Sequence, residues 1–142
     1  MQLNPYLHFN GNCEAALKFY EKNLGGTLGM VMRYSDAPPP KDKDQACGNM
    51  ENMANKIMHA RITIGEQIVM ASDCPEGKAE PMKGFCLNLN FTKPGDADRV
   101  FNALLEKGHA IMPIAETFWA VRFGMLVDQF GVPWMVNCER AR

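Results

Sequence analysis

ETFWAVRFGMLVDQFGVPWMVN, residues 116–137, is the stretch that decides the fold. It holds both tryptophans of the chain, and its centre, Asp128 to Gly131, has the residues of a tight turn. Asp at the first turn position bonds the backbone ahead, and Gly is favoured at the fourth position. The runs on either side, 122–127 and 132–137, are strand-length and rich in aromatic and β-branched residues. The stretch therefore predicts a hairpin that buries one of its faces.

Upstream of this hairpin, the second half of the chain predicts two more strands and a helix. Apolar residues alternate with polar ones over 85–91, which indicates a strand. A helix follows, because apolar residues recur at helical spacing between a capping Asp96 and a terminating Gly108. A strand over 110–115 then leads into the hairpin.

The first half predicts the same order of elements. A strand over 3–9 precedes a helix from Cys13 to Leu24, which Asn12 caps and Gly25 ends. Three strands follow, at 27–34, 56–64 and 67–73. The order strand, helix, strand, strand, strand thus occurs twice. Such repetition predicts two similar modules packed as one pseudo-twofold domain over 1–142, with module one at about 1–74, a connector at 75–83 and module two at about 84–138.

Composition excludes several classes of protein. The 142 residues carry a net charge of −1 without a run of like charges, so the basic surface of a nucleic-acid-binding protein is absent. No apolar stretch is long enough to cross a membrane, and the first residues do not have the pattern of a signal peptide. Five scattered cysteines without a Cys-x-x-Cys pair argue against a disulfide framework or a structural zinc site. We therefore expect a cytoplasmic protein.

One long segment has no periodic pattern. Residues 35–55 contain three consecutive prolines and mixed charges. Irregular segments of this length in a small domain are usually functional or mobile. Two interpretations stay open, a mobile surface loop or a lid on a site.

The motifs of the chain resemble those of a known family. The residues that carry the resemblance are 5–16, Phe19-Tyr20, Leu24-Gly25, 116–120 and 128–137. Together with the repeated βαβββ order, they resemble the vicinal oxygen chelate superfamily, which includes glyoxalase I, extradiol dioxygenases, and fosfomycin and bleomycin resistance proteins, and within it the PhnB-like branch. The resemblance implies an α+β fold with two βαβββ modules, in which a curved mixed sheet forms a ligand cup.

The usual metal site of that superfamily is not expected here. Its metal-using members place one ligand, usually His or Glu, on the first and last strand of each module. A divalent ion held by such nitrogen and oxygen ligands stays open to substrate oxygens. The corresponding positions in this chain are Asn4 or Pro5, Val69 or Met70, Cys86 or Leu87, and Met135. We therefore predict no metal or other cofactor and do not expect glyoxalase I activity.

A pocket lined by methionine and polar side chains is the expected replacement. Strand alternation places six polar side chains on the face away from the helices: Tyr6, His8, His59, Arg61, Asn88 and Asn90. Trp119, Arg122 and Met135 complete the predicted ligand-binding set, with Arg61 and Arg122 as the cations that face the cup. Imidazole is the natural proton carrier near neutral pH, and Arg binds a carboxylate or phosphonate through two hydrogen bonds.

The catalytic candidates are His59 and Glu116. Glu116 is either a base or a carboxylate tied to backbone amides beside Trp119. Trp119 and Trp134 are either core or interface anchors or side chains that stack on a substrate. A label of the PhnB-like branch, ubiquinone methyl transfer, finds no support, because Gly11 is not part of the Gly-rich turn of a Rossmann methyltransferase.

Three functions remain as hypotheses. The first is a small-molecule-binding protein or enzyme that acts without the usual metal. The second is a metal-dependent lyase, transferase or dioxygenase-type enzyme that uses His8, His59 and Glu116 as a rearranged site. The third is a drug-sequestering protein without catalysis. The resemblance also implies a homodimer, and two-fold pairing is the commonest form of soluble oligomers.

Overall fold

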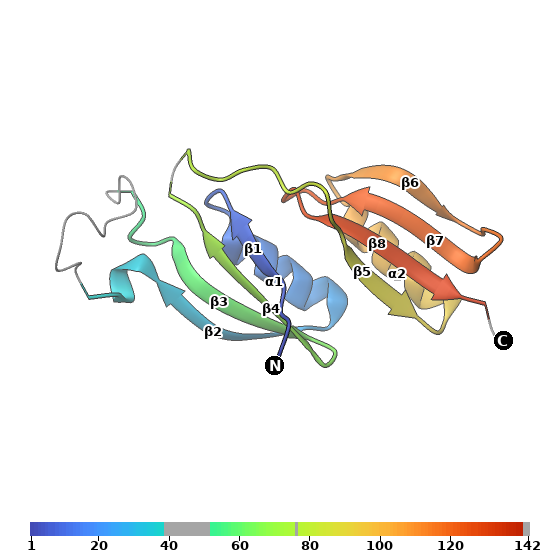
Figure 1. Cartoon of the computed structure of the whole chain (residues 1–142), viewed down its shortest axis with the longest axis horizontal. Helices are drawn as coiled ribbons and strands as arrows, with labels where there is room; N and C mark the ends of the chain where they lie inside the picture. Colours follow the sequence, from blue (N-terminus) through green and yellow to red (C-terminus); the bar gives the residue numbers. More distant parts are fainter. Residues whose placement is uncertain (39–51, 76, 141–142) are drawn as a thin grey trace. The chain divides into compact units, whose positions relative to one another are not determined.

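A computed structural model describes residues 1–38, 52–75 and 77–140. Contacts between backbone segments divide the chain into two units, Met1–Glu80 and Pro81–Arg142. Each unit holds one α-helix and one four-stranded sheet (Figure 1). Most of the irregular segment predicted over 35–55 lies outside the described residues; its start forms a short 3₁₀ helix, η1, at Tyr34–Asp36.

Unit 1 has a mixed sheet with the strand order β1-β4-β3-β2. The bounds are β1 Tyr6–Phe9, α1 Cys13–Leu24, β2 Thr27–Arg33, β3 Ile57–Ile64 and β4 Gln67–Asp73. β1 pairs with β4 in parallel, and the other pairs are antiparallel. The helix lies behind the sheet in the view of Figure 1. The first and last strands of the unit are therefore neighbours, with β1 at one edge of the sheet.

The start of α1 is held by a residue that sequence reasoning did not choose. Asn12 takes the predicted cap position, but its side chain makes no capping hydrogen bond. Instead the Asp73 carboxylate, at the end of β4, accepts the Cys13 N–H at 2.9 Å and the Ile57 N–H at 2.9 Å. One buried carboxylate thus joins the start of α1, the start of β3 and the end of β4. Gly25 ends the helix in the left-handed conformation, as predicted.

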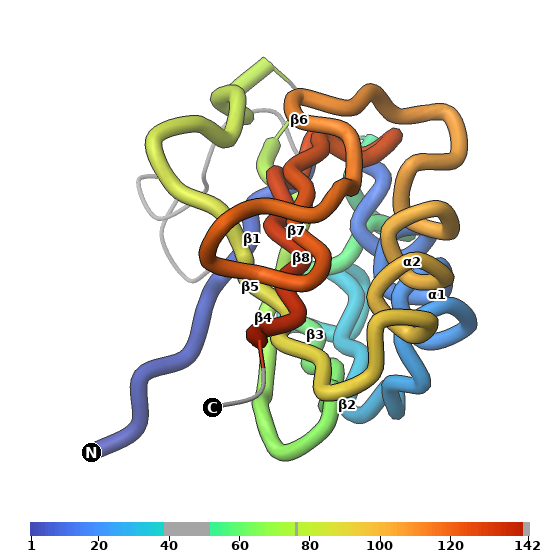
Figure 2. The backbone as a smooth tube through the Cα atoms, turned by 90° about the vertical axis from the view of Figure 1, so that its right-hand side faces the viewer, coloured from blue at the N-terminus to red at the C-terminus, as the bar shows by residue number. Residues whose placement is uncertain are grey.

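Unit 2 repeats the architecture with the strand order β5-β8-β7-β6. The bounds are β5 Leu87–Phe91, α2 Pro94–Leu105, β6 His109–Ala115, β7 Ala120–Val127 and β8 Pro133–Glu139. In Figure 2, α2 lies to one side of these strands, so the unit is a helix layer on a sheet layer. The prediction that Asp96 caps α2 is wrong, because the helix begins at Pro94 with Lys93 as its cap. Proline is favoured in the first helical turn, where no N–H is needed.

The turn between β7 and β8 has the predicted chemistry. The Gly131 N–H donates to the Asp128 carbonyl at 3.0 Å, and the Phe130 N–H donates to the Asp128 carboxylate at 2.9 Å. The same carboxylate accepts the Trp134 indole N–H at 2.9 Å. Trp134 is 2% exposed and lies in the core between α2 and the sheet. The hairpin prediction is confirmed, with Trp134 on its buried face.

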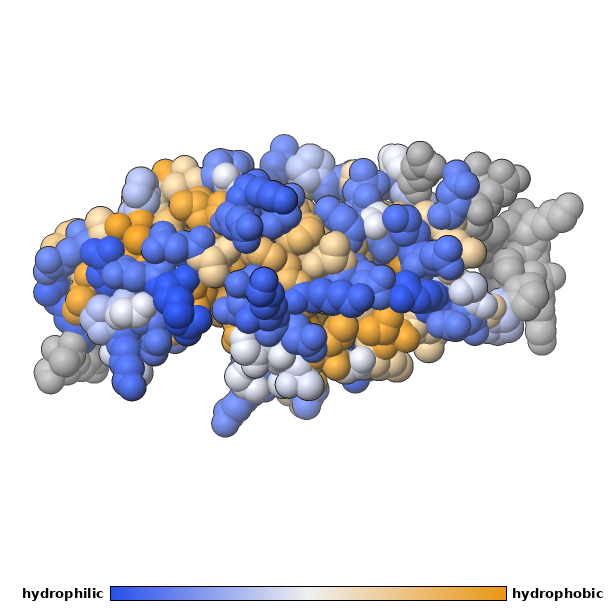
Figure 3. Space-filling model, turned by 180° about the vertical axis from the view of Figure 1, so that it is seen from behind, coloured by the Kyte–Doolittle hydropathy of each residue, from blue (hydrophilic) through white to orange (hydrophobic). Residues whose placement is uncertain are grey.

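The prediction of two βαβββ modules is confirmed, and each module has an open four-stranded sheet. Figure 3 shows hydrophilic side chains interspersed with hydrophobic ones on the reverse side of the view in Figure 1. In the described part of the chain, no helix is both long and apolar enough for a membrane span. The packing of the two modules into one pseudo-twofold domain stays a prediction.

Candidate functional site

The candidate site lies on the open face of unit 1, by which we mean the sheet face turned away from α1. Leu7 and Phe9 are 2% and 1% exposed and face the helix. The alternate residues of β1, Tyr6 and His8, therefore lie on the open face. Their parallel partners on β4 are Met70 and Ser72, and Arg61 of β3 lies opposite Met70.

Four of the predicted site residues meet on this face. The Tyr6 Oη and His59 Nδ1 atoms are hydrogen-bonded at 3.2 Å. The Arg61 Nε–H donates to His59 Nε2 at 3.4 Å. The Tyr6 ring centroid lies 5.0 Å from that of His8 and 5.7 Å from that of His59. We call Tyr6, His8, His59 and Arg61 the polar cluster.

The electrostatic environment of the polar cluster is positive. The four strands of unit 1 contain one acidic residue, Asp73, which is buried on the helix side. By contrast, the other arginine of these strands, Arg33, donates to Glu14 of α1 and holds the pKa of that carboxyl below its usual value. Among the described residues, no carboxylate pairs with Arg61. The Arg61 charge is therefore uncompensated on the open face.

The open face of unit 2 carries amides in place of the charged groups. Asn88 lies opposite Met135, and Asn90 lies opposite Asn137. The Asn90 Oδ1 atom accepts hydrogen bonds from the Asn88 amide at 3.2 Å and from the Asn137 amide at 3.1 Å. His8 and Asn90 hold matching positions in the two units, as predicted, because each pairs in parallel with the last strand of its module.

Sequence reasoning missed two residues of these faces. Ser72 and Asn137 lie opposite His8 and Asn90, and both follow a methionine of the same open face by two positions. Period-two alternation from Met70 and Met135 would have identified them.

The predicted placement of Arg122 is wrong. Arg122 lies opposite Cys138, a residue 1% exposed on the helix side of the sheet. Its Nε–H donates to the Asp98 carboxylate of α2 at 2.6 Å. The neighbouring open-face position is taken by Phe123, which pairs with Asn137. Arg122 therefore links β7 to α2 and does not face the ligand side.

Glu116 and Trp119 lie at the start of the last hairpin. The Glu116 carboxylate accepts a hydrogen bond from the Arg140 guanidinium, which also donates to the Thr117 carbonyl at 2.7 Å. Trp119 is 47% exposed and packs edge-on against Phe118 and Phe123, at centroid distances of 4.8 and 5.3 Å. Glu116 is thus tied to a side chain rather than to backbone amides, and Trp119 belongs to an exposed aromatic group.

The residues at the positions of the superfamily's metal ligands do not fit a divalent ion. Met70 and Met135 lie on the open faces, where thioethers stand at positions that carry His or Glu in metal-using members of the superfamily. In unit 1, Val69 is 7% exposed and faces α1. In unit 2, Leu87 pairs with the buried Trp134, on the sheet face that packs against α2. In the described ranges, no three His, Cys, Asp or Glu side chains are close enough to hold a metal. The alternative set stays a prediction, because His8 and His59 belong to unit 1 and Glu116 to unit 2.

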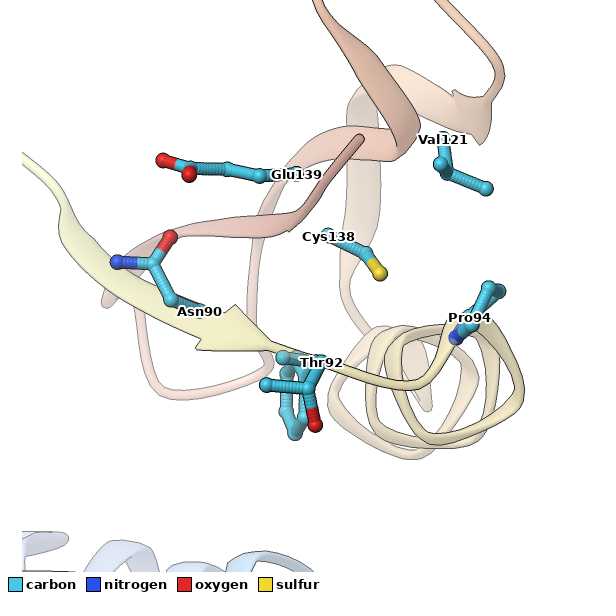
Figure 4. Close-up of a pocket in the computed structure, with 7 residues that line it drawn as sticks. Asn90, Thr92, Pro94, Val121, Cys138 and Glu139 are labelled. Atoms are coloured by element: carbon cyan, nitrogen blue, oxygen red, sulfur yellow. The ribbon is translucent and has the colours of Figure 1, made fainter. Parts of the chain in front are cut away.

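A hollow of about 610 Å³ lies within unit 2, where β5 and β8 end and α2 begins. Its lining is mainly apolar, with Thr92 as one polar member and Asn90 and Glu139 as two more. Figure 4 shows these two side chains pointing away from α2, whereas the Cys138 sulfur points toward the gap between Val121 and Pro94. The predicted Asn90 therefore belongs both to the amide group and to the rim of this hollow.

Comparisons with known proteins agree with this architecture. The family model of the Glyoxalase/Bleomycin resistance protein/Dioxygenase superfamily matches residues 2–136. Protein YjdN of Escherichia coli (strain K12) is 38% identical over 140 residues, which cover 96% of this chain and 95% of that protein. The crystal structure of protein PA1353 from Pseudomonas aeruginosa is 44% identical, with a TM-score of 0.86 over 99% of each chain.

A more distant structure extends the likeness of fold. The PhnB protein from Bacillus cereus, described as a putative 3-demethylubiquinone-9 3-methyltransferase, is 22% identical. Its TM-score is 0.78, over 97% of this chain and 99% of that chain. The duplicated βαβββ architecture, the family model and the two closer relatives lead to one conclusion: the chain belongs to the glyoxalase/bleomycin resistance protein/dioxygenase superfamily.

Proposed function

We propose that this chain is a small-molecule-binding protein or enzyme of its superfamily whose ligand lies against the open face of unit 1, without the usual His and Glu metal site. The observation that carries the proposal is the hydrogen-bonded series Tyr6, His59 and Arg61. Polar side chains on a sheet surface are usually solvated separately. Here three polar side chains from two strands converge, and one of them is the Arg61 guanidinium, which has no carboxylate partner among the described residues. Such convergent polar groups orient a polar ligand.

The proposal predicts that removal of the cluster abolishes ligand binding without unfolding the protein. The protein is screened by thermal shift against a panel of small carboxylates, phosphates, phosphonates, amides and aromatic compounds, and hits are measured by calorimetry. The His59→Ala, Arg61→Ala double variant should lose at least about tenfold in affinity, because it removes charged and neutral hydrogen bonds.

Arg99→Ala is the matched control, since Arg99 is an exposed arginine on α2 whose partner is Asp96 at 3.8 Å. It should bind hits as the unchanged protein does. Hits that bind the double variant equally well would place the ligand elsewhere, and a screen without hits would remove the basis of the proposal. Incubation of each hit with the protein then separates the alternatives, because a sequestering protein returns the ligand unchanged and an enzyme does not.

The description of the Bacillus cereus relative as a putative methyltransferase does not extend to the proposal. In this chain β1 is followed by Asn10, Gly11 and Asn12, and Gly11 is the one glycine there. A Rossmann methyltransferase needs a Gly-rich turn at that point. The parallel pair of β1 and β4 also lies in a mixed four-stranded sheet rather than in a doubly wound one.

A rearranged metal site is the second candidate function. Two imidazoles, His8 and His59, lie beside Tyr6, but the described residues bring no further His, Cys, Asp or Glu close enough to complete a metal site with them. Elemental analysis of protein purified without chelator tests it. A stoichiometric divalent metal, together with a rise in melting temperature on its addition, would support the metal enzyme. Metal-free protein whose melting temperature does not change with added Zn²⁺, Mn²⁺ or Ni²⁺ would exclude it.

A further inference from the structure

We infer that the open face of unit 1 is an oxyanion-binding site, in which Tyr6 and Arg61 donate hydrogen bonds to the ligand and His59 positions both. This inference rests on the proposed function and adds the chemical class of the ligand. It is carried by the direction of the hydrogen bonds within the polar cluster.

The Arg61 contact fixes the protonation of His59. A guanidinium has N–H donors and no acceptor, so the His59 Nε2 atom, 3.4 Å from Arg61 Nε, must be the acceptor. An imidazole nitrogen accepts a hydrogen bond when it carries no proton. In this arrangement His59 takes the tautomer with its proton on Nδ1.

The state of His59 in turn fixes the direction of the Tyr6 contact. With a proton on Nδ1, His59 donates to the Tyr6 Oη atom at 3.2 Å. The phenol oxygen is then the acceptor, and its own O–H proton points away from His59. Tyr6 is 40% exposed, so this proton is accessible on the open face.

The groups that remain for a ligand are therefore donors. Both ring nitrogens of His59 are engaged, which leaves the Tyr6 O–H and the two terminal nitrogens of Arg61. The strands of unit 1 place no carboxylate on this face, because Asp73 is buried on the helix side. A ligand that presents two acceptor oxygens and a negative charge, such as a carboxylate or a phosphate group, matches this arrangement.

His59 is accordingly a positioning residue rather than a general base. A base needs a nitrogen with a free lone pair directed at the substrate. In His59 the unprotonated nitrogen accepts from Arg61, and the protonated one donates to Tyr6. Its role is to aim the phenol proton and to hold the Arg61 side chain beside it.

The ¹⁵N spectrum of His59 tests the first step directly. In the full-length protein at neutral pH, the His59 ring should show a protonated Nδ1 and an unprotonated Nε2. Assignment follows from the loss of this signal set in His59→Gln. A proton on Nε2, or a ring that exchanges freely between both forms, would overturn the inference even if ligands bind.

Titration with two matched probes tests the ligand class. Acetate and acetamide have the same shape and differ in charge, and inorganic phosphate serves as a second anion. At constant ionic strength, acetate and phosphate should shift the Arg61 and Tyr6 resonances saturably, whereas acetamide should not. The relative affinities of acetate and phosphate distinguish a carboxylate site from a phosphate site. Equal binding of acetamide and acetate would overturn the assignment.

Variants separate the roles of the three residues. Arg61→Gln should weaken anion binding about tenfold or more, and Tyr6→Phe about threefold to tenfold. His59→Gln should stay within about threefold of the unchanged protein, because a Gln amide also offers one acceptor and one donor, whereas His59→Ala should resemble Tyr6→Phe. Arg99→Gln, away from the sheet, should have no effect, and unchanged backbone spectra show that each variant is folded.

The two proposals fail in different ways. If no compound of any class binds to the open face of unit 1, the proposed function fails, and this inference fails with it. If neutral compounds bind through Tyr6 and Arg61 as tightly as anions, or if His59→Gln loses as much affinity as His59→Ala, the proposed function stands. In that case only the assignment of an oxyanion and of a positioning histidine is overturned.

Discussion

Two buried aspartates show how single residues determine this fold. Asp73 is the last residue of β4 and accepts two backbone N–H groups. Asp128 directly follows β7 and accepts two backbone N–H groups and an indole N–H. They are 1% and 3% exposed. A buried carboxylate is stable when its oxygens are hydrogen-bonded. The Asp128 turn could be predicted from local sequence, but Asp73 could not, since its partners are 60 and 16 residues away.

Asp73→Ala should lower the free energy of unfolding by about 3 kcal/mol, because it leaves two buried N–H groups without acceptors. Urea denaturation measures this change. Asp96→Ala is the control, since Asp96 has Arg99 as a partner at 3.8 Å on the surface, and it should change stability by less than about 0.5 kcal/mol. Equal effects of both substitutions would contradict the role given to Asp73.

The burial of the Cys13 thiol can be tested by its reactivity toward an alkylating reagent. Burial, followed by the charges of Asp73 and Glu14, raises the pKa of Cys13 to about 12. The thiol therefore stays protonated at pH 8, and it is 0% exposed. Peptide mapping after iodoacetamide treatment should find Cys13 unmodified in the folded protein and modified in urea. Cys86, which is partly exposed, should react faster than Cys13. Rapid native labelling of Cys13 would contradict the placement of α1 against the sheet.

At the scale of elements, alternation predicted the strands but not every face. The polar cluster was predicted because β1 and β3 have one apolar and one polar face. In β7 both faces are largely apolar, with Phe123 on one side and Leu126 on the other, so alternation does not place Arg122. Its long side chain reaches α2 from the helix side. The bounds of α2 were missed for a local reason, the preference of Pro94 for the first turn.

Close packing of β7 against α2 depends on Gly124. A Cβ atom there would lie 2.6 Å from Phe101 Cε2 and 3.0 Å from Ile114 Cα. Gly124→Ala should therefore destabilise the protein by about 1–3 kcal/mol through overpacking. Gly95→Ala is the matched control in α2, where a Cβ would meet nothing within 4 Å, and it should be neutral or slightly stabilising. Thermal unfolding of both variants compares them, and a neutral Gly124→Ala would contradict the packing.

At the scale of the whole molecule, the repeat in the sequence was sufficient to predict two βαβββ modules. Each unit pairs its first and last strands in parallel and covers one face with a helix. The oligomeric state cannot be predicted in this way, because it depends on exposed side chains. Phe118, at 89% exposed, and Trp119 form an apolar surface on unit 2. We propose that this aromatic surface is part of a homodimer interface.

Phe118→Asp should convert a dimer into a monomer, because a carboxylate at the contact would lose its hydration. Sedimentation velocity at micromolar concentration measures the change. Phe85→Asp is a control of similar character, since Phe85 is 49% exposed elsewhere on unit 2. A chain that sediments as a monomer without any substitution would contradict the proposal of a homodimer.

The matching registers of the two sheets have a consequence for which substitutions can change the ligand of such a protein. Arg61 lies opposite Met70 in unit 1, and Met125 lies opposite Met135 in unit 2. The two methionines stand where metal-using members of the superfamily have a ligand. Their partners on the parallel strand are Tyr6 and Asn88. The open face of unit 1 thus carries a cation at this position and that of unit 2 a neutral side chain, while both units have a helix-facing core. In β1 and β3, residues of the open face alternate with residues that pack toward the helix. Substitutions at the exposed open-face positions of β1 and β3 can therefore change the ligand chemistry of unit 1 while they leave its helix-facing core unchanged.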